Sequence, residues 1–314
     1  MQTIETWYLF SVNDHSLLKS GVDDFLPVMN PFDKAAKPFR PTLYEVLADR
    51  AFDFFNSYDT YSNENAASFA VNEPWYLADA KEFIGKKVVT DDTASSRYKM
   101  IRLYQDILRI QINAGNKEAA ADYDLKRMQY VFQQATMQDK AELYINGLTR
   151  LADVNKNAPY YTEIIAAMAN QIKSQKEDTL ANVKALNLCK DAVKKHPESP
   201  GAGKCLQIIN EITKPSLQLY GELVYPSGAP LLLAMDYNNV NSIKIETVKL
   251  DQDFYKLSRN DGQEKVIDYL KKATKLRVEK QNLTKSENYV SQRMEMSHTK
   301  LPYGEYAVLV SSLD

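Results

Sequence analysis

The sequence predicts a helical N-terminal region followed by an antiparallel β-region within a chain of 314 residues. Between about residues 42 and 212, apolar residues recur at three- and four-residue spacing, which is typical of amphipathic helices. From Ser216 onward the apolar residues alternate with polar ones, which is typical of half-buried strands. The change falls at Pro215. We therefore expect a helical repeat domain at residues 1–213 and a β-sandwich domain at residues 214–314.

The composition is that of a globular protein and excludes several classes of function. Hydrophobic residues make up 44% of the chain and charged residues 25%, which is enough to build a packed core. Lys and Arg total 39 against 41 Asp and Glu, so no basic surface for nucleic acid is expected. No run of apolar residues approaches the length that crosses a bilayer, and we expect no membrane span. The 10 glycines argue against a phosphate-binding loop, and no cofactor is expected.

The first 40 residues lack a regular apolar period. Residues 7–10 and the proline-punctuated residues 25–41 are therefore expected to form an extended segment lying along the first helices. Thr42 is the expected N-cap of the first helix, with Glu45 completing a capping box three residues later.

The predicted helices are separated by short breaks, which join antiparallel neighbours and indicate a row of helical hairpins. These breaks fall at residues 115–116, 138–139, 155–159, 175–178 and 196–201. A recurrence of about 40 residues favours a TPR-like solenoid of helix pairs over a closed bundle. The tyrosines along these helices are expected to separate helix pairs with their hydroxyls at the surface. The alternative is a ligand groove lined by Tyr104, Tyr123, Tyr130, Tyr144, Tyr160 and Tyr161.

The last third of the chain contains short alternating runs separated by turn residues. Strands are expected at residues 217–223, 231–235, 243–250, 275–283 and 306–310. A change of parity between Ile245 and Val248 indicates a bulge, and residues 264–270 are expected to form a single helix. Six or seven short strands in about 100 residues predict an antiparallel, Ig-like sandwich.

The two cysteines are the most informative pair in the sequence. Cys189 and Cys205 each lie eight residues from Pro197, so in an antiparallel hairpin they would reach the same level. A disulfide needs Cα atoms roughly 4.4–6.8 Å apart, which small neighbouring residues would allow. The alternative is two buried thiols that act as small apolar residues. No further Cys or His stands at zinc-ligand spacing, so no metal site is expected.

The sequence offers no catalytic constellation, and we do not expect an enzyme. His15, His196 and His298 are far apart and fall in predicted loops. Asp14, His15 and Ser16 are the residue types of a catalytic triad, but adjacent residues cannot form the triad's geometry.

Several blocks of the sequence resemble the N-terminal part of the bacterial alpha-2-macroglobulin family. These blocks are residues 41–44, 50–55, 185–189, 196–202, 212–217 and 301–306, with Cys205. The resemblance implies a helical repeat region followed by the first macroglobulin-like domain of a protease trap. In many members of the family an internal thioester captures the protease, and it requires a Cys followed two and three residues later by Glu and Gln. Neither Cys189 nor Cys205 has that context.

The resemblance therefore implies a non-catalytic module with an interaction and structural role. This module would be the N-terminal part of an endopeptidase inhibitor. Its partners would be proteins, among them proteases. It would be exported to the bacterial periplasm or the outer-membrane surface, with its signal and any lipid anchor outside these residues. Two other functions are open. A surface glycan- or peptide-binding lipoprotein would need an exposed aromatic platform, and an enzyme would need a pocket with converging titratable groups.

Overall fold

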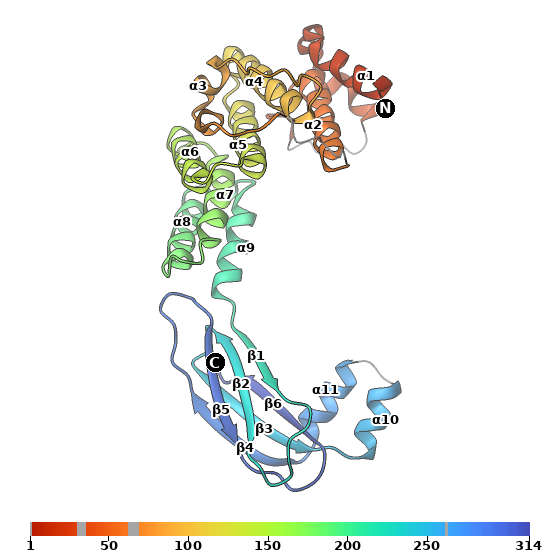
Figure 1. The fold of residues 1–314 in the computed structure, drawn as a ribbon, viewed down its shortest axis with the longest axis vertical. Coiled ribbons are helices and arrows are strands. Elements are labelled where there is room, and N and C mark those ends of the chain that lie inside the picture. Colours follow the sequence, from red (N-terminus) through yellow and green to blue (C-terminus); the bar gives the residue numbers. More distant parts are fainter. Residues whose placement is uncertain (1, 30–35, 62–68, 261–262) are drawn as a thin grey trace. The chain divides into compact units, whose positions relative to one another are not determined.

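The computed structural model describes residues 2–29, 36–61, 69–260 and 263–314. Helices come first along the chain and two small antiparallel sheets follow (Figure 1). The first α-helices are α1 (Gln2–Asn13), α2 (Leu43–Tyr61), α3 (Ala80–Gly85), α4 (Ser96–Ala114), α5 (Lys117–Gln134), α6 (Lys140–Val154), α7 (Tyr161–Lys173), α8 (Ala181–Lys195) and α9 (Ala202–Thr213). Short 3₁₀ helices are η1 (His15–Lys19), η2 (Val22–Val28) and η4 (Pro74–Leu77). The predicted order of helices and then strands is confirmed.

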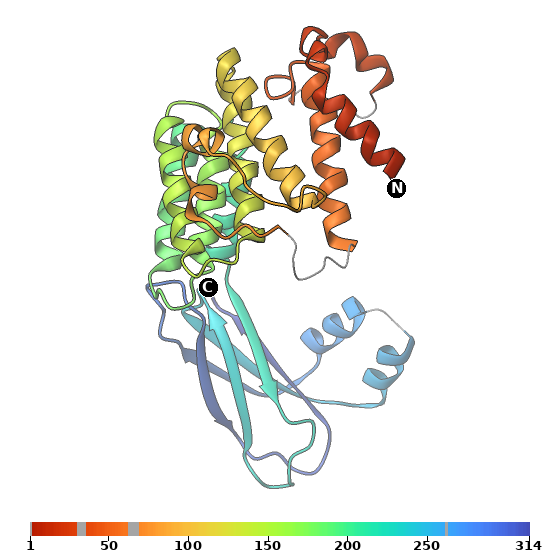
Figure 2. The same cartoon turned by 45° about the horizontal axis from the view of Figure 1, so that its top comes forward.

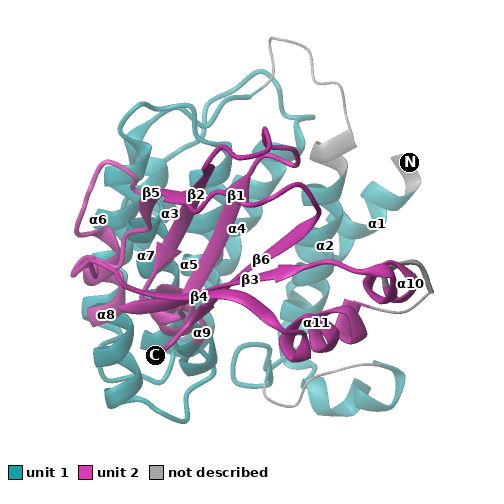
Figure 3. Ribbon diagram, turned by 90° about the horizontal axis from the view of Figure 1, so that it is seen from below, with its two compact units in different colours: residues 1–174, 188–206 teal, residues 175–187, 207–314 magenta. Residues whose placement is uncertain are grey.

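The chain divides into two compact units (Figure 3). One comprises residues 1–174 and 188–206, and the other comprises residues 175–187 and 207–314, so the division passes through α8 and α9. The predicted change at residues 213 and 214 matches the end of α9 at Thr213. As a division into domains, that boundary stays a prediction.

In the first unit, the longer helices α1, α2 and α4 to α7 pack on one another in chain order. α1 contacts α2, α2 contacts α4, and α4 to α7 follow in sequence order (Figures 1 and 2). The break between α4 and α5 is made by Gly115, which adopts a left-handed φ of +72°, and by Asn116, whose side chain accepts a hydrogen bond from the Ala119 backbone. Glycine carries no steric penalty in that conformation, and asparagine is a favourable N-cap.

The tyrosines of these helices belong to the core. Tyr104, Tyr123, Tyr130, Tyr144 and Tyr160 are all buried. The Tyr123 hydroxyl donates to the Glu45 carbonyl at 3.3 Å, and the Tyr160 hydroxyl donates to Asp122 at 2.8 Å. For these five tyrosines the expectation that the hydroxyls reach the surface was therefore wrong, and Tyr123 and Tyr160 bind acceptors within the helical unit instead.

The N-terminal segment is helical where an extended segment was expected. Tyr8 stacks on Phe54 of α2, Val12 is buried, and the Tyr44 hydroxyl donates to the Val12 carbonyl. These contacts place one face of α1 on α2. Its apolar residues show no clear period because Trp7 and Phe10 remain exposed. Part of the proline-punctuated stretch, residues 30–35, lies outside the described residues.

The predicted capping box at Thr42 is half formed. The Glu45 carboxylate accepts a hydrogen bond from the Thr42 backbone at 2.8 Å and a second one from the Thr42 hydroxyl. The hydroxyl thus binds the Glu45 side chain rather than its backbone N–H. The other Glu45 oxygen accepts from Gln111 of α4 at 2.7 Å, so this turn is tied to the helical core.

The second unit contains two three-stranded antiparallel sheets. One has the order β1-β2-β5 and the other has the order β4-β3-β6. The strands are β1 (Ser216–Gly221), β2 (Leu231–Asn238), β3 (Ser242–Lys249), β4 (Lys275–Asn282), β5 (Gln292–His298) and β6 (Tyr306–Ser312). The predicted bulge lies between Thr247 and Val248, where the β3–β4 register shifts.

Both sheets contribute to one apolar cluster. Met235 and Tyr237 come from β2, Ile243 and Ile245 come from β3, and Val240 lies between these strands. Partly buried residues of β1, β5 and β6 pack against this cluster. The sheets therefore share a core, as their alternating apolar residues require.

Two features of this unit differ from the expectation. Between β3 and β4 the chain forms two helices, α10 (Gln252–Asn260) and α11 (Gln263–Lys272), where one was expected (Figure 1). His298, expected in a loop, ends β5 and is buried. The sequence of β5 alternates Met294 and Met296 with polar residues, but methionine is not a strong strand former, so the strand was missed.

Candidate functional site

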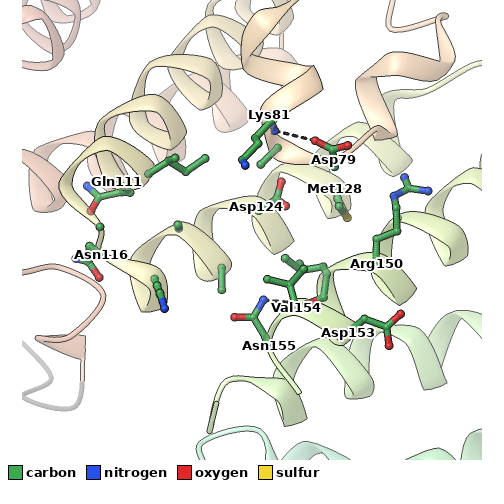
Figure 4. Close-up of a pocket in the computed structure, with 18 residues that line it drawn as sticks. Asp79, Lys81, Gln111, Asn116, Asp124, Met128, Arg150, Asp153, Val154 and Asn155 are labelled. Atoms are coloured by element: carbon green, nitrogen blue, oxygen red, sulfur yellow. Dashed lines mark hydrogen bonds between the residues drawn. The ribbon is translucent and has the colours of Figure 1, made fainter. Parts of the chain in front are cut away.

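A groove of about 810 Å³ opens in the first unit between α3, α4, α5 and α6 (Figure 4). Its surface is mainly apolar and includes Ile112, Ala120, Ala121, Met128, Leu151 and Val154. Asp79 and Lys81 lie across the hollow from Val154 and Asn155 (Figure 4). Val154, at the end of α6, is 85% exposed although it is apolar. An exposed apolar residue in a concave apolar surface is a feature of binding sites.

Small residues create this hollow. Ala120 and Ala121 of α5 leave space beside the end of α4. Gly147 of α6 allows close packing, since a Cβ there would lie 3.1 Å from the Leu77 carbonyl and 3.2 Å from the Met128 sulfur. A larger residue at position 147 would push α6 away from η4 and α5, so the width of the groove depends on this glycine.

One wall of the groove is the segment formed by η4 and α3, and Arg127 of α5 anchors it. Arg127 is fully buried and donates to the Tyr76 carbonyl at 2.6 Å and the Ala78 carbonyl at 2.8 Å. Its guanidinium also lies over the Phe83 ring, with the central carbon 4.5 Å from the ring centroid. A rigid guanidinium with several donors is suited to hold an irregular backbone segment in place.

Two further side chains hold the same wall. Gln105 of α4 donates to the Phe83 carbonyl at 2.8 Å and the Lys86 carbonyl at 2.9 Å. Arg150 of α6 donates to the Leu77 carbonyl at 3.0 Å. Three helices therefore fix the wall, and the groove is preformed.

Asp124 is the buried carboxylate of the groove. Its Oδ1 accepts two hydrogen bonds from Arg127, at 2.8 Å from Nε and 2.6 Å from Nη2. Burial raises the pKa of Asp124 above its ordinary value and the nearby Asp79 adds to the rise, while Arg127 and Arg150 oppose it. The pair neutralises two charges that would otherwise be costly in the protein interior.

The charged residues around the groove balance one another. Asp79, Asp124 and Asp153 line it together with Lys81, Lys117 and Arg150, three of each sign. The residues that line it in the described part of the chain include no Ser, Thr, Cys, Tyr or His. With an apolar surface and balanced charge, the groove fits an apolar segment with polar flanks better than a highly charged ligand.

A second, polar hollow of about 430 Å³ lies between α2, α4 and α5. Asp49, Asp53 and Lys126 line it, with Tyr104 and Tyr130. Asp49 is engaged by Arg40 and Lys126, so these charges already serve the core. The groove with the apolar surface is therefore the stronger candidate site.

The structure brings the side chains of the two cysteines together, as the hairpin prediction required. Cys189 of α8 and Cys205 of α9 are both completely buried. Their thiols hydrogen-bond to each other, which raises the pKa of Cys189 and lowers the pKa of Cys205. Both cysteines are free thiols in this structure.

The three histidines belong to different elements of the chain. His15 is exposed and contacts the Tyr44 ring edge-on, while Asp14 caps η1 by accepting from the Ser16 backbone at 3.0 Å. His196 lies 3.2 Å from the Lys156 carbonyl through Nε2. In the described part of the chain, no group of three or more His, Cys, Asp or Glu side chains is placed to hold a metal ion.

His298 joins the two sheets through a buried polar contact. Its Nε2 lies 2.7 Å from the Thr247 hydroxyl of β3, and its Nδ1 lies 3.6 Å from Glu279 of β4. This arrangement resembles the order of groups in a catalytic triad, but Thr247 is completely buried and no substrate can reach its hydroxyl. The contact is therefore structural.

The sequence did not reveal the groove, since its residues come from four separate segments. Gly115 and Asn116 were recognised only as a break between helices. A usable signal was the run of three alanines at residues 119–121, because small residues on a helix leave space between its neighbours.

No family model, curated protein or solved structure matches the chain. Among the described residues, none of the helices combines the length and the apolar character needed to cross a bilayer.

Proposed function

We propose that this chain is a non-catalytic protein-interaction module whose helical unit binds an apolar segment of a partner protein in the groove. The observation that carries the proposal is the preformed apolar surface between α4, α5 and α6, with Val154 85% exposed at its edge. Burying a side chain of this size contributes about 1.5–3 kcal/mol of favourable free energy, so a partner that covers Val154 would gain binding free energy.

The groove's shape and charge favour an extended or helical segment of protein as its occupant. A surface formed by neighbouring helices offers an elongated hollow, and recognition of this kind depends on a few apolar anchor residues. Both signs of charge surround the groove, so polar residues of either sign at the flanks of the segment find partners.

We also propose that the chain is the leading part of an alpha-2-macroglobulin-like protease trap of the bacterial cell envelope. The resemblance of the sequence blocks supports this assignment, together with the order of helices and then sheets. A TPR-like solenoid and a macroglobulin-like sandwich belong to the same proposal. They are supported by the stepwise packing of the helices and by the core that both sheets share. The test is to mix the full-length protein with a protease. If the protein is a trap, we expect the protease to lose activity on large substrates and to keep cutting small peptides.

The lipoprotein alternative is less well supported. It needs aromatic rings exposed together on one face, whereas five of the six tyrosines expected to line such a groove are buried, namely Tyr104, Tyr123, Tyr130, Tyr144 and Tyr160. The groove itself contains no aromatic residue among those described.

The groove is tested by selecting peptides from a random display library on the immobilised chain and measuring their affinity for two variants. Val154→Asp puts a charge on the apolar surface, and we expect it to weaken binding about tenfold or more, the equivalent of about 1.4 kcal/mol. Val89→Asp is the matched control because Val89 is 83% exposed and lies outside the groove.

Peptides with apolar anchors that bind Val89→Asp normally and Val154→Asp weakly would support the proposal. Equal affinity for both variants would place the binding elsewhere on the molecule, and failure to enrich any peptide would also contradict the proposal.

A further inference from the structure

We propose that Cys189 and Cys205 form an intramolecular disulfide that joins α8 to α9, made by exchange with an external disulfide such as glutathione disulfide. The inference is independent of the groove and of the family assignment. It rests on where the α8–α9 hairpin places the two sulfur atoms.

The two cysteines occupy the same level of the hairpin. α8 ends at Lys195 and α9 begins at Ala202, and each cysteine lies eight residues from Pro197 in the turn between them. Both side chains are completely buried and hydrogen-bond to each other, so they face inward. This is the arrangement that a bridge between antiparallel helices requires.

Small residues flank both cysteines on the inner helix faces. Ala185 and Ala192 lie about one turn before and after Cys189, and Ala202 lies one turn before Cys205. All three are buried. Large side chains at these positions would hold the helices apart, whereas alanine allows the close approach that a disulfide needs.

The turn of the hairpin and the start of α9 are fixed against α7, which defines the position of the Cys205 sulfur. The Ser199 hydroxyl lies 2.8 Å from the Thr162 hydroxyl, and Lys204 pairs with Glu163 at 2.6 Å. The Cys205 thiol donates to the Thr162 carbonyl at 3.5 Å. These contacts hold the turn and the start of α9 on α7.

The exchange proceeds in two balanced steps. Both sulfurs are completely buried in the folded hairpin, so the exchange takes place while the α8–α9 hairpin is locally open. Cys205, whose pKa the neighbouring Cys189 lowers, is the first nucleophile. Its thiolate attacks one sulfur of glutathione disulfide, forms a mixed disulfide and releases one glutathione thiolate. Cys189 then loses its proton and attacks the Cys205 sulfur, forming the internal disulfide and releasing the second glutathione. Two protein thiols are oxidised and one external disulfide is reduced to two thiols.

The disulfide is tested by equilibrating the native chain with glutathione disulfide, blocking free thiols with N-ethylmaleimide in denaturant and measuring the mass. We expect loss of two hydrogen masses, no maleimide adduct, and a melting temperature raised by several degrees that dithiothreitol lowers again. Trypsin separates the two cysteines into peptides 185–190 and 205–244, which we expect to remain linked without reductant.

The variants Cys189→Ser and Cys205→Ser serve as controls, because neither can form the linked peptides. Two maleimide adducts, two glutathione adducts on one chain, or a covalent dimer after equilibration would each overturn the proposal. A reference sample oxidised during refolding shows that the linked peptides are detectable.

Discussion

Two aspartates on one turn of α5 show how the environment of a single residue determines its role. Asp122 and Asp124 are both largely buried, yet their pKa values move in opposite directions. Burial dominates at Asp124 and raises its pKa. At Asp122 burial has the same tendency, but Lys126, Arg40 and the Tyr160 hydroxyl outweigh it and lower the pKa.

Asp122 should therefore make the helical unit sensitive to acid. Its pKa is lower in the folded than in the unfolded chain, so its stabilising contribution is present above about pH 4 and is lost as the pH falls below that value. We expect Asp122→Asn to lower the free energy of unfolding at pH 7 by about 1.5–3 kcal/mol and to flatten its decline in acid. Urea unfolding at several pH values measures both effects.

Glu118→Gln is the control for that experiment because it removes an exposed carboxylate from the same helix. If Glu118→Gln and Asp122→Asn gave the same pH dependence, the ion pairs of Asp122 with Arg40 and Lys126 would not contribute to stability.

At the scale of elements, the helices with a clear apolar period could be predicted from the sequence. The breaks at Gly115 and Asn116 and at residues 196–201 are where the structure has them. α1 could not be predicted, because its helical state depends on Tyr8 and Val12 packing against α2. The groove could not be predicted from the sequence either, since the contact of Gly147 with η4 depends on how three segments pack together.

The packing of the α8–α9 turn on α7 should depend strongly on Gly201. A Cβ at this position would lie 2.3 Å from the Glu163 backbone nitrogen, and backbone atoms cannot yield as a flexible side chain can. We expect Gly201→Ala to lower the free energy of unfolding by about 1–3 kcal/mol, as overpacking does. Guanidinium denaturation followed by circular dichroism gives the value.

Gly203→Ala is the matched control two residues later. A Cβ added at Gly203 would meet no other part of the described chain within 4 Å, and the residue is inside α9. We expect this change to be neutral or to stabilise the chain by up to about 1 kcal/mol, because alanine favours helix more than glycine does. A loss of stability equal to that of Gly201→Ala would show that steric contact with α7 is not the cause.

At the scale of the whole molecule, the chain has two hydrophobic cores of different origin. The first is built from helices that follow one another, with buried residues such as Ile107, Val131 and Leu148. The second combines strands that are distant in sequence, since β2 pairs with β5 and β3 pairs with β6. The groove and the cysteine pair both belong to the first unit, whereas the buried His298 contact belongs to the second.

Because each unit has its own core, we expect the chain to unfold in two calorimetric transitions. Gly201→Ala should lower the midpoint of one transition and leave the other in place. Met235→Ala, which opens a cavity in the sheet core, should lower the other midpoint, at a cost of about 2–5 kcal/mol. Scanning calorimetry of the chain and both variants separates the two effects. A single transition that both substitutions shift together would mean that the two cores unfold as one cooperative unit.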